Sequence, residues 1–224
     1  MIAPLACVIP AYNAAATLAN VLRELRVALP HAALIVVDDG SDDATHAIAC
    51  ATDARVIAFR RNRGKGAALR AAFAETLALG VSAVLTMDAD GQHDARYAPA
   101  VLDALTCADV AIGIRARDGG AMPLGRRLTN ALASSAVGSI VGVPIADAQS
   151  GFRAMRRQVL EHVHAHGERY EFETDFLIQA GRAGYRIASV PIPTIYGTPS
   201  HFRAVRDSMR VVRTIWRGRY RATQ

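Results

Sequence analysis

The chain has few cysteines, a single lysine and no long apolar run among its 224 residues. Cys7, Cys50 and Cys107 are too few and too scattered for a disulfide framework or a zinc site, so we expect a reducing, cytoplasmic environment. Cys7 lies in an apolar run, where a buried free thiol is expected. No stretch reaches the roughly 20 apolar residues that a membrane-spanning helix needs. The first residues carry no basic segment and lead into a strand-like run, so we expect no signal peptide.

Acidic side chains balance the basic ones except near the C-terminal end. The net charge is +6, and from Tyr196 onward one acid, Asp207, accompanies seven arginines: Arg203, Arg206, Arg210, Arg213, Arg217, Arg219 and Arg221. The rest of the chain is near neutral, which argues against a nucleic-acid polymer as a partner. The local excess favours an anionic partner at that end or a solvated tail.

The same C-terminal stretch has apolar residues at helical spacing: Phe202, Val205, Met209, Val212 and Trp216. We therefore expect a basic amphipathic helix over residues 200–224. Such a helix can lie peripherally on the inner face of an anionic membrane. It can equally dock on the domain with its arginines in water.

Short apolar runs alternate with helix-like segments in the first half of the chain. We expect strands at Leu5–Ile9, Leu34–Asp38, Arg55–Phe59, Ala83–Met87 and Val110–Ile114. Helices are expected at Ala15–Leu29, Asp42–Ala51 and Gly66–Leu79. Because the strands are apolar on both faces, this alternation predicts a doubly wound α/β fold, with helices covering both sides of a mostly parallel sheet.

Beyond Ile114 the pattern is less regular. Glycines and a proline punctuate Arg115–Leu124, which predicts a mobile loop. Further elements are expected at Arg126–Val141 (helix), Gln149–Met155 (strand), Thr174–Ala183 (helix) and Arg186–Ile192 (strand). Since no break in composition separates these segments from the first half, we expect a single domain.

Polar residues follow each of the first four predicted strands. They are Pro10-Ala11-Tyr12-Asn13, Asp38-Asp39-Gly40-Ser41, Asn62-Arg63-Gly64-Lys65-Gly66 and Asp88-Ala89-Asp90-Gly91-Gln92. In doubly wound sheets, ligands bind beyond the carboxyl ends of the strands. The sequence therefore predicts one site at this edge.

The segment from Asp88 to Gln92 carries the strongest local signal. Two carboxylates one residue apart can converge on Mg²⁺ or Mn²⁺ and leave positions for diphosphate oxygens. An EF-hand loop is excluded, because its sixth position is His93 and its twelfth is Pro99. A plain acidic turn is the alternative.

Two other segments at this edge could bind parts of a ligand. Asp39 can accept a hydrogen bond from a nucleobase, or its segment can be only a turn and helix cap. The loop around Lys65, the one lysine in the chain, fits neither a Walker A loop nor a dinucleotide fingerprint, because the required glycines are missing. Glycines beside a cation at a helix start nevertheless suit a phosphate.

If the site transfers a group, the residues that meet the accepting substrate are expected in the second half of the chain. Glu173 or Asp175 could serve as the general base that a hydroxyl acceptor needs. A phosphate acceptor arrives as an anion and needs arginines to hold it. Arg115, Arg126 and Arg127 border the predicted mobile loop, although they can equally be a solvated helix start.

In order along the chain, these segments resemble glycosyltransferase family 2 of the GT-A fold, in its dolichol-phosphate or polyprenyl-phosphate mannose or glucose synthase-like branch. The resemblance is carried by VIPAYN, VVDDGSDDAT, NRGKGAALRAAF, MDADGQHD, the Arg115 loop, SGFRAM, YEFETDFL and VPIPTIYG. It implies a GT-A domain over residues 1–199, with a nucleotide-sugar and metal-binding half (1–114) and an acceptor half (115–199).

The resemblance also implies roles for individual residues. The nucleotide sugar would be bound by Pro10, Tyr12, Asn13, Asp39, Lys65, Asp88 and Ala89. The divalent metal would be held by Asp88, Asp90 and Gln92. The acceptor phosphate would be gripped by Arg115, Arg126 and Arg127, and the catalytic set would be Lys65, Asp90, Glu173 and Asp175.

The function that we expect is an inverting transfer of a hexose from a UDP- or GDP-sugar to a polyprenyl phosphate. One alternative is a hydroxyl acceptor on another lipid or small molecule, with Glu173 or Asp175 as base. Alternatives from other classes are a nicotinamide-dependent oxidoreductase and a non-catalytic protein that binds nucleotide sugars or scaffolds a membrane.

Overall fold

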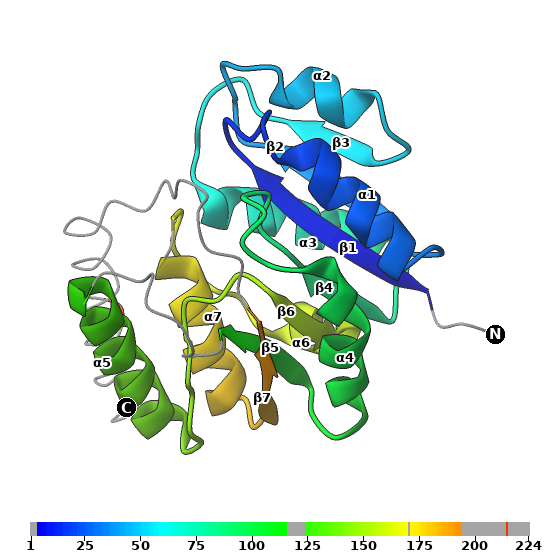
Figure 1. Cartoon of the computed structure of the whole chain (residues 1–224). Helices are drawn as coiled ribbons and strands as arrows, with labels where there is room; N and C mark the ends of the chain where they lie inside the picture. Colours follow the sequence, from blue (N-terminus) through cyan, green and yellow to red (C-terminus); the bar gives the residue numbers. More distant parts are fainter. Residues whose placement is uncertain (1–3, 116–123, 170, 194–213, 215–224) are drawn as a thin grey trace.

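A seven-stranded sheet forms the centre of the molecule (Figure 1). The computed structural model describes residues 4–115, 124–169, 171–193 and 214. The strands are β1 (Leu5–Ala11), β2 (Ala33–Asp38), β3 (Arg55–Ala58), β4 (Ala83–Thr86), β5 (Val110–Arg115), β6 (Arg153–Arg156) and β7 (Ile187–Ile192). They lie in the order β3-β2-β1-β4-β6-β5-β7. Only β6 runs antiparallel to its neighbours, so the predicted mostly parallel sheet is confirmed.

Helices cover both faces of this sheet, as the sequence predicts. They are α1 (Leu18–Ala28), α2 (Thr45–Cys50), α3 (Lys65–Ala78), α4 (Ala98–Asp103), α5 (Leu124–Val141), α6 (Arg157–His162) and α7 (Glu171–Arg182). Short 3₁₀ turns at Ala95–Tyr97 and Ala104–Thr106 flank α4. Because strand side chains alternate between faces, Val8 packs with one buried cluster and Cys7 with the other. Cys7 is fully buried, as predicted.

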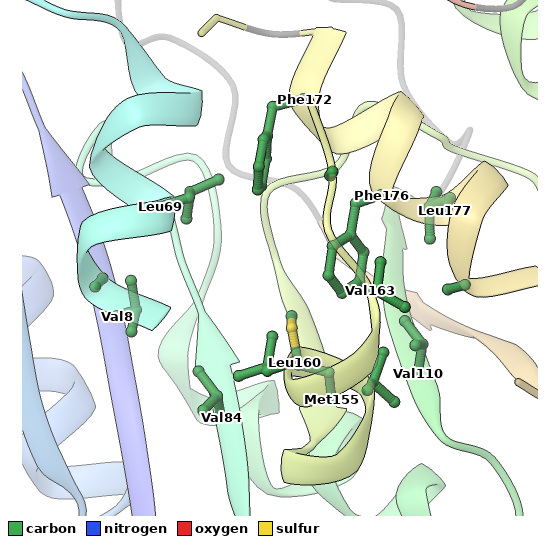
Figure 2. Packing of buried hydrophobic residues seen from close by; sticks show 14 of the residues in the cluster. Val8, Leu69, Val84, Val110, Met155, Leu160, Val163, Phe172, Phe176 and Leu177 are labelled. Carbon is green, nitrogen blue, oxygen red and sulfur yellow. The ribbon is translucent and has the colours of Figure 1, made fainter. Parts of the chain in front are cut away.

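The two buried clusters contain different helices. One cluster takes its helical side chains from α3, α5, α6 and α7, including Leu69, Leu160, Phe172 and Phe176 (Figure 2). The other takes them from α1, α2 and α4. Two apolar layers therefore enclose the sheet and fix the strand ends from which the polar residues extend.

Several predicted boundaries differ from the observed ones. The helix expected from Asp42 begins at Thr45, because the Asp43 carboxylate accepts from the backbone of Ala15 and Thr45 and holds this stretch as a loop. The strand expected at Gln149–Met155 is shortened to β6, since the preceding residues form turns. The sequence analysis also missed α4 and α6, which have six residues each.

Some predictions concern residues that the structure does not describe. The loop at 116–123 and almost all of the C-terminal stretch 200–224 lie outside the described residues. The division into halves at residue 114 stays a prediction. Among the helices that are described, none is long and apolar enough to cross a membrane.

Candidate active site

The carboxyl ends of β1, β2 and β4 meet at one edge of the sheet, where the sequence predicts the site. Ala11 is paired with Asp38, and the backbone N–H of Asp39 donates to the Ala11 carbonyl at 2.8 Å. Beyond β4, the N–H of Met87 donates to the Val8 carbonyl at 3.0 Å. The polar segments that follow these strands are therefore held beside one another.

Asn13 fastens the segment after β1 to the segment after β2. Its backbone has a φ of 49°, its N–H donates to Ser41 Oγ at 2.9 Å, and its Oδ1 accepts from the Asp42 N–H at 2.9 Å. Pro10 and Tyr12 are half-buried beside it. The three residues predicted to line the nucleoside pocket thus lie together at the end of β1.

Asp39 is buried and tied to the loop after β3. Its Oδ1 accepts from the Arg63 N–H at 2.7 Å, and its Oδ2 accepts from the Gly64 N–H at 2.8 Å. Burial raises the pKa of this carboxyl, and the two backbone donors oppose that effect in part. The carboxylate positions the segment that leads to Lys65, while its predicted role toward a nucleobase stays a prediction.

Lys65 joins two acids from distant parts of the chain. It is the first residue of α3, and its Nζ lies 2.6 Å from Asp88 Oδ1 and 3.0 Å from Glu173 Oε1. The side chains of Lys65 and Glu173 are only 14% and 4% exposed, whereas that of Asp88 is 24% exposed. The structure thus brings together three of the predicted catalytic and donor-binding residues.

The turn before β6 packs directly against Asp88. A Cβ atom on Gly151 would lie 2.5 Å from both Cγ and Oδ1 of Asp88, so any side chain at this position would displace the carboxylate. Arg153 holds the same turn in place through hydrogen bonds. Its side chain is buried and donates to the carbonyls of Ser150 at 2.7 Å, Ala148 at 2.8 Å and Glu173 at 2.9 Å.

Gly151 and Arg153 are site residues to which the sequence analysis gave no role. The run Ser150-Gly151-Phe152-Arg153 is a weak motif when taken alone, and it entered only as part of the family resemblance. The available signal was a glycine two residues before an arginine that begins a buried strand.

Burial and neighbouring charges shift the pKa values of the charged residues around Lys65. Burial alone would raise the pKa of Asp88, but Lys65, His93 and Arg153 together outweigh burial and hold the pKa of Asp88 below its ordinary value. Burial raises the pKa of Glu173, against the lowering effects of Lys65 and Arg153. Burial lowers the pKa of Arg153 from its usual high value. The Lys65 ammonium therefore favours the ionised form of Asp88.

The glycines that flank Lys65 serve backbone packing. The N–H groups of Gly66 and Ala67 donate to the Glu168 carbonyl at 2.8 and 3.3 Å. A Cβ on Gly66 would lie 2.7 Å from the Gly167 carbonyl oxygen, and one on Gly64 would collide with Glu168. A protein carbonyl thus already accepts from two amides at this end of α3, while the phosphate site expected beside Lys65 stays a prediction.

The predicted metal ligands Asp88, Asp90 and Gln92 lie on one tight turn. Asp90 Oδ1 accepts from the Gln92 N–H at 3.0 Å, and the Ala89 carbonyl accepts from Thr17 Oγ1 at 2.5 Å. Within the described ranges, no three His, Cys, Asp or Glu side chains meet in a cluster that could hold a metal ion. Two carboxylates are too few for a closed protein cage, but they fit Mg²⁺ or Mn²⁺ that completes its shell with water and substrate phosphates.

The remaining predicted residues are not shown in contact with Lys65, Asp88 or Glu173. The Asp175 Oδ2 accepts from the His166 N–H at 2.6 Å and from Gln179 Nε2 at 2.8 Å, and it is not brought together with Lys65. Arg115 ends β5, where it is paired with Ile192. Arg126 and Arg127 fall in the first turn of α5, and the side chains of all three arginines lie outside the described structure.

Several known proteins resemble this chain in sequence. The family model "Glycosyl transferase family 2" matches residues 6–163. The undecaprenyl-phosphate mannosyltransferase of Micrococcus luteus is 34% identical over 196 residues, covering 83% of this chain and 81% of the relative. The polyprenol monophosphomannose synthase of Mycolicibacterium smegmatis is 35% identical over 198 residues, covering 83% and 75%.

A solved structure shows the same fold. Glucosyl-3-phosphoglycerate synthase from Mycobacterium tuberculosis, in complex with Mn²⁺, UDP and phosphoglyceric acid, superposes with a TM-score of 0.79 at 22% identity. The match covers 97% of this chain and 78% of that protein. The likeness identifies the sheet and its helices as a GT-A fold.

Proposed function

This chain belongs to glycosyl transferase family 2, and from that premise we propose that it moves a hexose, with inversion, from a nucleotide sugar to a polyprenyl phosphate. The observation that carries the proposal is the joining of Lys65, Asp88 and Glu173 at the edge where the β1 and β2 loops also meet. Two relatives are named for transfer to, or synthesis of, polyprenyl-linked phosphates.

At the donor end, Asp88 and Asp90 would hold Mg²⁺ or Mn²⁺ with the donor diphosphate. When bound, the cation neutralises the charge of the departing nucleoside diphosphate. Lys65 adds a positive charge beside Asp88. Tyr12 and Asn13 would line the nucleoside pocket from the end of β1.

At the acceptor end, neither predicted acid is well placed as a general base. Glu173 is almost fully buried and paired with Lys65, and the Asp175 carboxylate already accepts from His166 and Gln179. A hydroxyl acceptor needs such a base, whereas a phosphate arrives already ionised. This supports a phosphate acceptor, which Arg115, Arg126 and Arg127 would hold through charge-assisted hydrogen bonds.

The first test is transfer from GDP-mannose or UDP-glucose to undecaprenyl phosphate in detergent with Mn²⁺, with undecaprenol as the hydroxyl acceptor. We expect product only with the phosphate, loss of about a hundredfold or more in Asp90→Asn, and only a small loss in Asp175→Asn. Asp94→Asn makes the same change four residues along and serves as control, because Asp94 caps a 3₁₀ turn. Transfer to undecaprenol that disappears in Asp175→Asn would establish the hydroxyl alternative instead.

Ligand binding can be tested separately by thermal shift with UDP, GDP and NAD, each with and without Mn²⁺. A nucleotide at about 100 times its Kd adds roughly 2.7 kcal/mol of stability. We expect metal-dependent stabilisation by UDP or GDP, and its loss in Asp90→Ala. Stabilisation by NAD alone, without metal, would favour the oxidoreductase alternative over ours.

We also propose that residues 200–224 bring the enzyme to the inner face of an anionic membrane as a peripheral contact. The sequence supplies seven arginines there and Trp216, the one tryptophan of the chain. Binding to phosphatidylglycerol vesicles should blue-shift the tryptophan emission and weaken with salt. No binding at low salt would indicate that this stretch docks on the protein.

A further inference from the structure

Asp88 is a predicted cation ligand that already has a cation. The Lys65 ammonium lies 2.6 Å from its Oδ1, and Gly151 packs so closely against the carboxylate that it cannot retreat on that side. A divalent ion at Asp88 would place two positive groups on one carboxylate. The ammonium and the metal therefore compete for Asp88.

Glu173 provides a second place for the ammonium. Its Oε1 lies 3.0 Å from Lys65 Nζ, while its Oε2 is buried and has no hydrogen-bond partner among the described residues. A buried carboxylate oxygen without a donor is costly, so it favours any arrangement that brings a donor closer. Arg153 holds the Glu173 backbone in place by donating to its carbonyl at 2.9 Å.

We propose that Lys65 is a tethered counter-ion, which neutralises Asp88 in the cation-free enzyme and moves fully onto Glu173 when Mg²⁺ or Mn²⁺ binds. The flexible four-carbon stem of lysine permits a shift between two neighbouring carboxylates. Glu173 is then a positioning residue that acts through Lys65. This inference rests on the metal site of the proposed function.

The proposal makes a specific statement about cation affinity in the absence of nucleotide. Removing the ammonium in Lys65→Met should free Asp88, so that Mn²⁺ binds about tenfold more tightly. Removing the charge of the second carboxylate in Glu173→Gln should retain Lys65 on Asp88, so that Mn²⁺ binds about fivefold more weakly. Glu171→Gln, the same change two residues earlier on α7, is the control and should leave the affinity within about twofold.

A double-mutant cycle separates this exchange from simple electrostatics. If Glu173 acts through Lys65, then Glu173→Gln should change Mn²⁺ affinity by less than about twofold in the Lys65→Met background. Additive effects of the two substitutions would overturn the proposal, as would an unchanged or weakened affinity in Lys65→Met.

The experiment is a titration of the full chain with Mn²⁺, in which the free ion is followed by electron paramagnetic resonance. Thermal unfolding of every variant identifies those that do not fold. If Lys65→Met does not fold, Lys65→Gln replaces it and must show the same gain in affinity. Wild-type protein that binds no Mn²⁺, even with UDP or GDP, would overturn the metal site itself. If the wild-type protein binds Mn²⁺ and the affinity does not change when Lys65 is substituted, only the counter-ion proposal is overturned.

Discussion

Removing Arg153 should destabilise the protein more than removing any ordinary surface arginine. The residue is 3% exposed, and its guanidinium donates to three backbone carbonyls at 2.7, 2.8 and 2.9 Å. Each buried carbonyl left without a donor costs about 1–3 kcal/mol, and the loss of one partner from a buried charge cluster costs about 3–5 kcal/mol. Because the turn can relax and admit water, we expect Arg153→Met to lower the free energy of unfolding by about 3–5 kcal/mol.

The assay is urea unfolding of Arg153→Met beside Arg156→Met as the control. Arg156 lies on the same strand and donates to the carbonyls of Ala108 and Leu105, with Asp109 3.9 Å away. Because its side chain is 43% exposed and water can replace these contacts, we expect the free energy of unfolding to fall by only about 1 kcal/mol. For a chain of this size, 4 kcal/mol corresponds to a Tm lower by roughly 8–16 °C. A loss in Arg153→Met within about 1 kcal/mol of the control would refute the reasoning.

Three further changes test other contacts. Gly151→Ala should lower the free energy of unfolding by about 1–3 kcal/mol and abolish metal-dependent nucleotide binding, because the new Cβ displaces Asp88. Unchanged nucleotide binding in a thermal-shift assay would contradict this prediction. Asp39→Asn should cost about 1–3 kcal/mol in urea unfolding, since an amide can accept from only one of the two N–H groups that the carboxylate satisfies. Burial raises the pKa of Cys7 from 9.0 to about 12, so folding retains a proton that the unfolded chain loses above pH 9. The stability of wild type relative to Cys7→Ala should therefore fall by about 1.4 kcal/mol per pH unit between pH 9 and 12, and a pH-independent difference would contradict the assignment.

Much of the fold could be predicted because the first four strands carry strong signals. Each is a short apolar run followed by polar residues, and parallel strands buried on both faces have this pattern. The reversed direction of β6 could not be read in the same way. Its place between β4 and β5 depends on pairing with distant segments, and a run of apolar and basic residues does not encode direction. The helices α4 and α6 are too short for a clear helical period.

The site was predictable where its members are close in sequence. Asp88 and Asp90 are separated by one residue, which is itself a signal for a shared cation. The bridge from Lys65 to Glu173 joins residues that are far apart in the chain, and its evidence is a distance of 3.0 Å that no spacing reveals. The family resemblance named both residues, but only the folded structure shows that they are in contact.

The glycines beside Lys65 show why one sequence pattern allowed two structures. A small residue at a helix start permits the backbone to approach either a ligand phosphate or another part of the chain, and the sequence is identical in both cases. Here the Glu168 carbonyl accepts from the N–H groups of Gly66 and Ala67, so these two amides are already satisfied. The proposed function then requires positive charge at this edge from the Lys65 side chain and from a bound cation. That requirement gives physical weight to a lysine that can leave Asp88 without leaving the site.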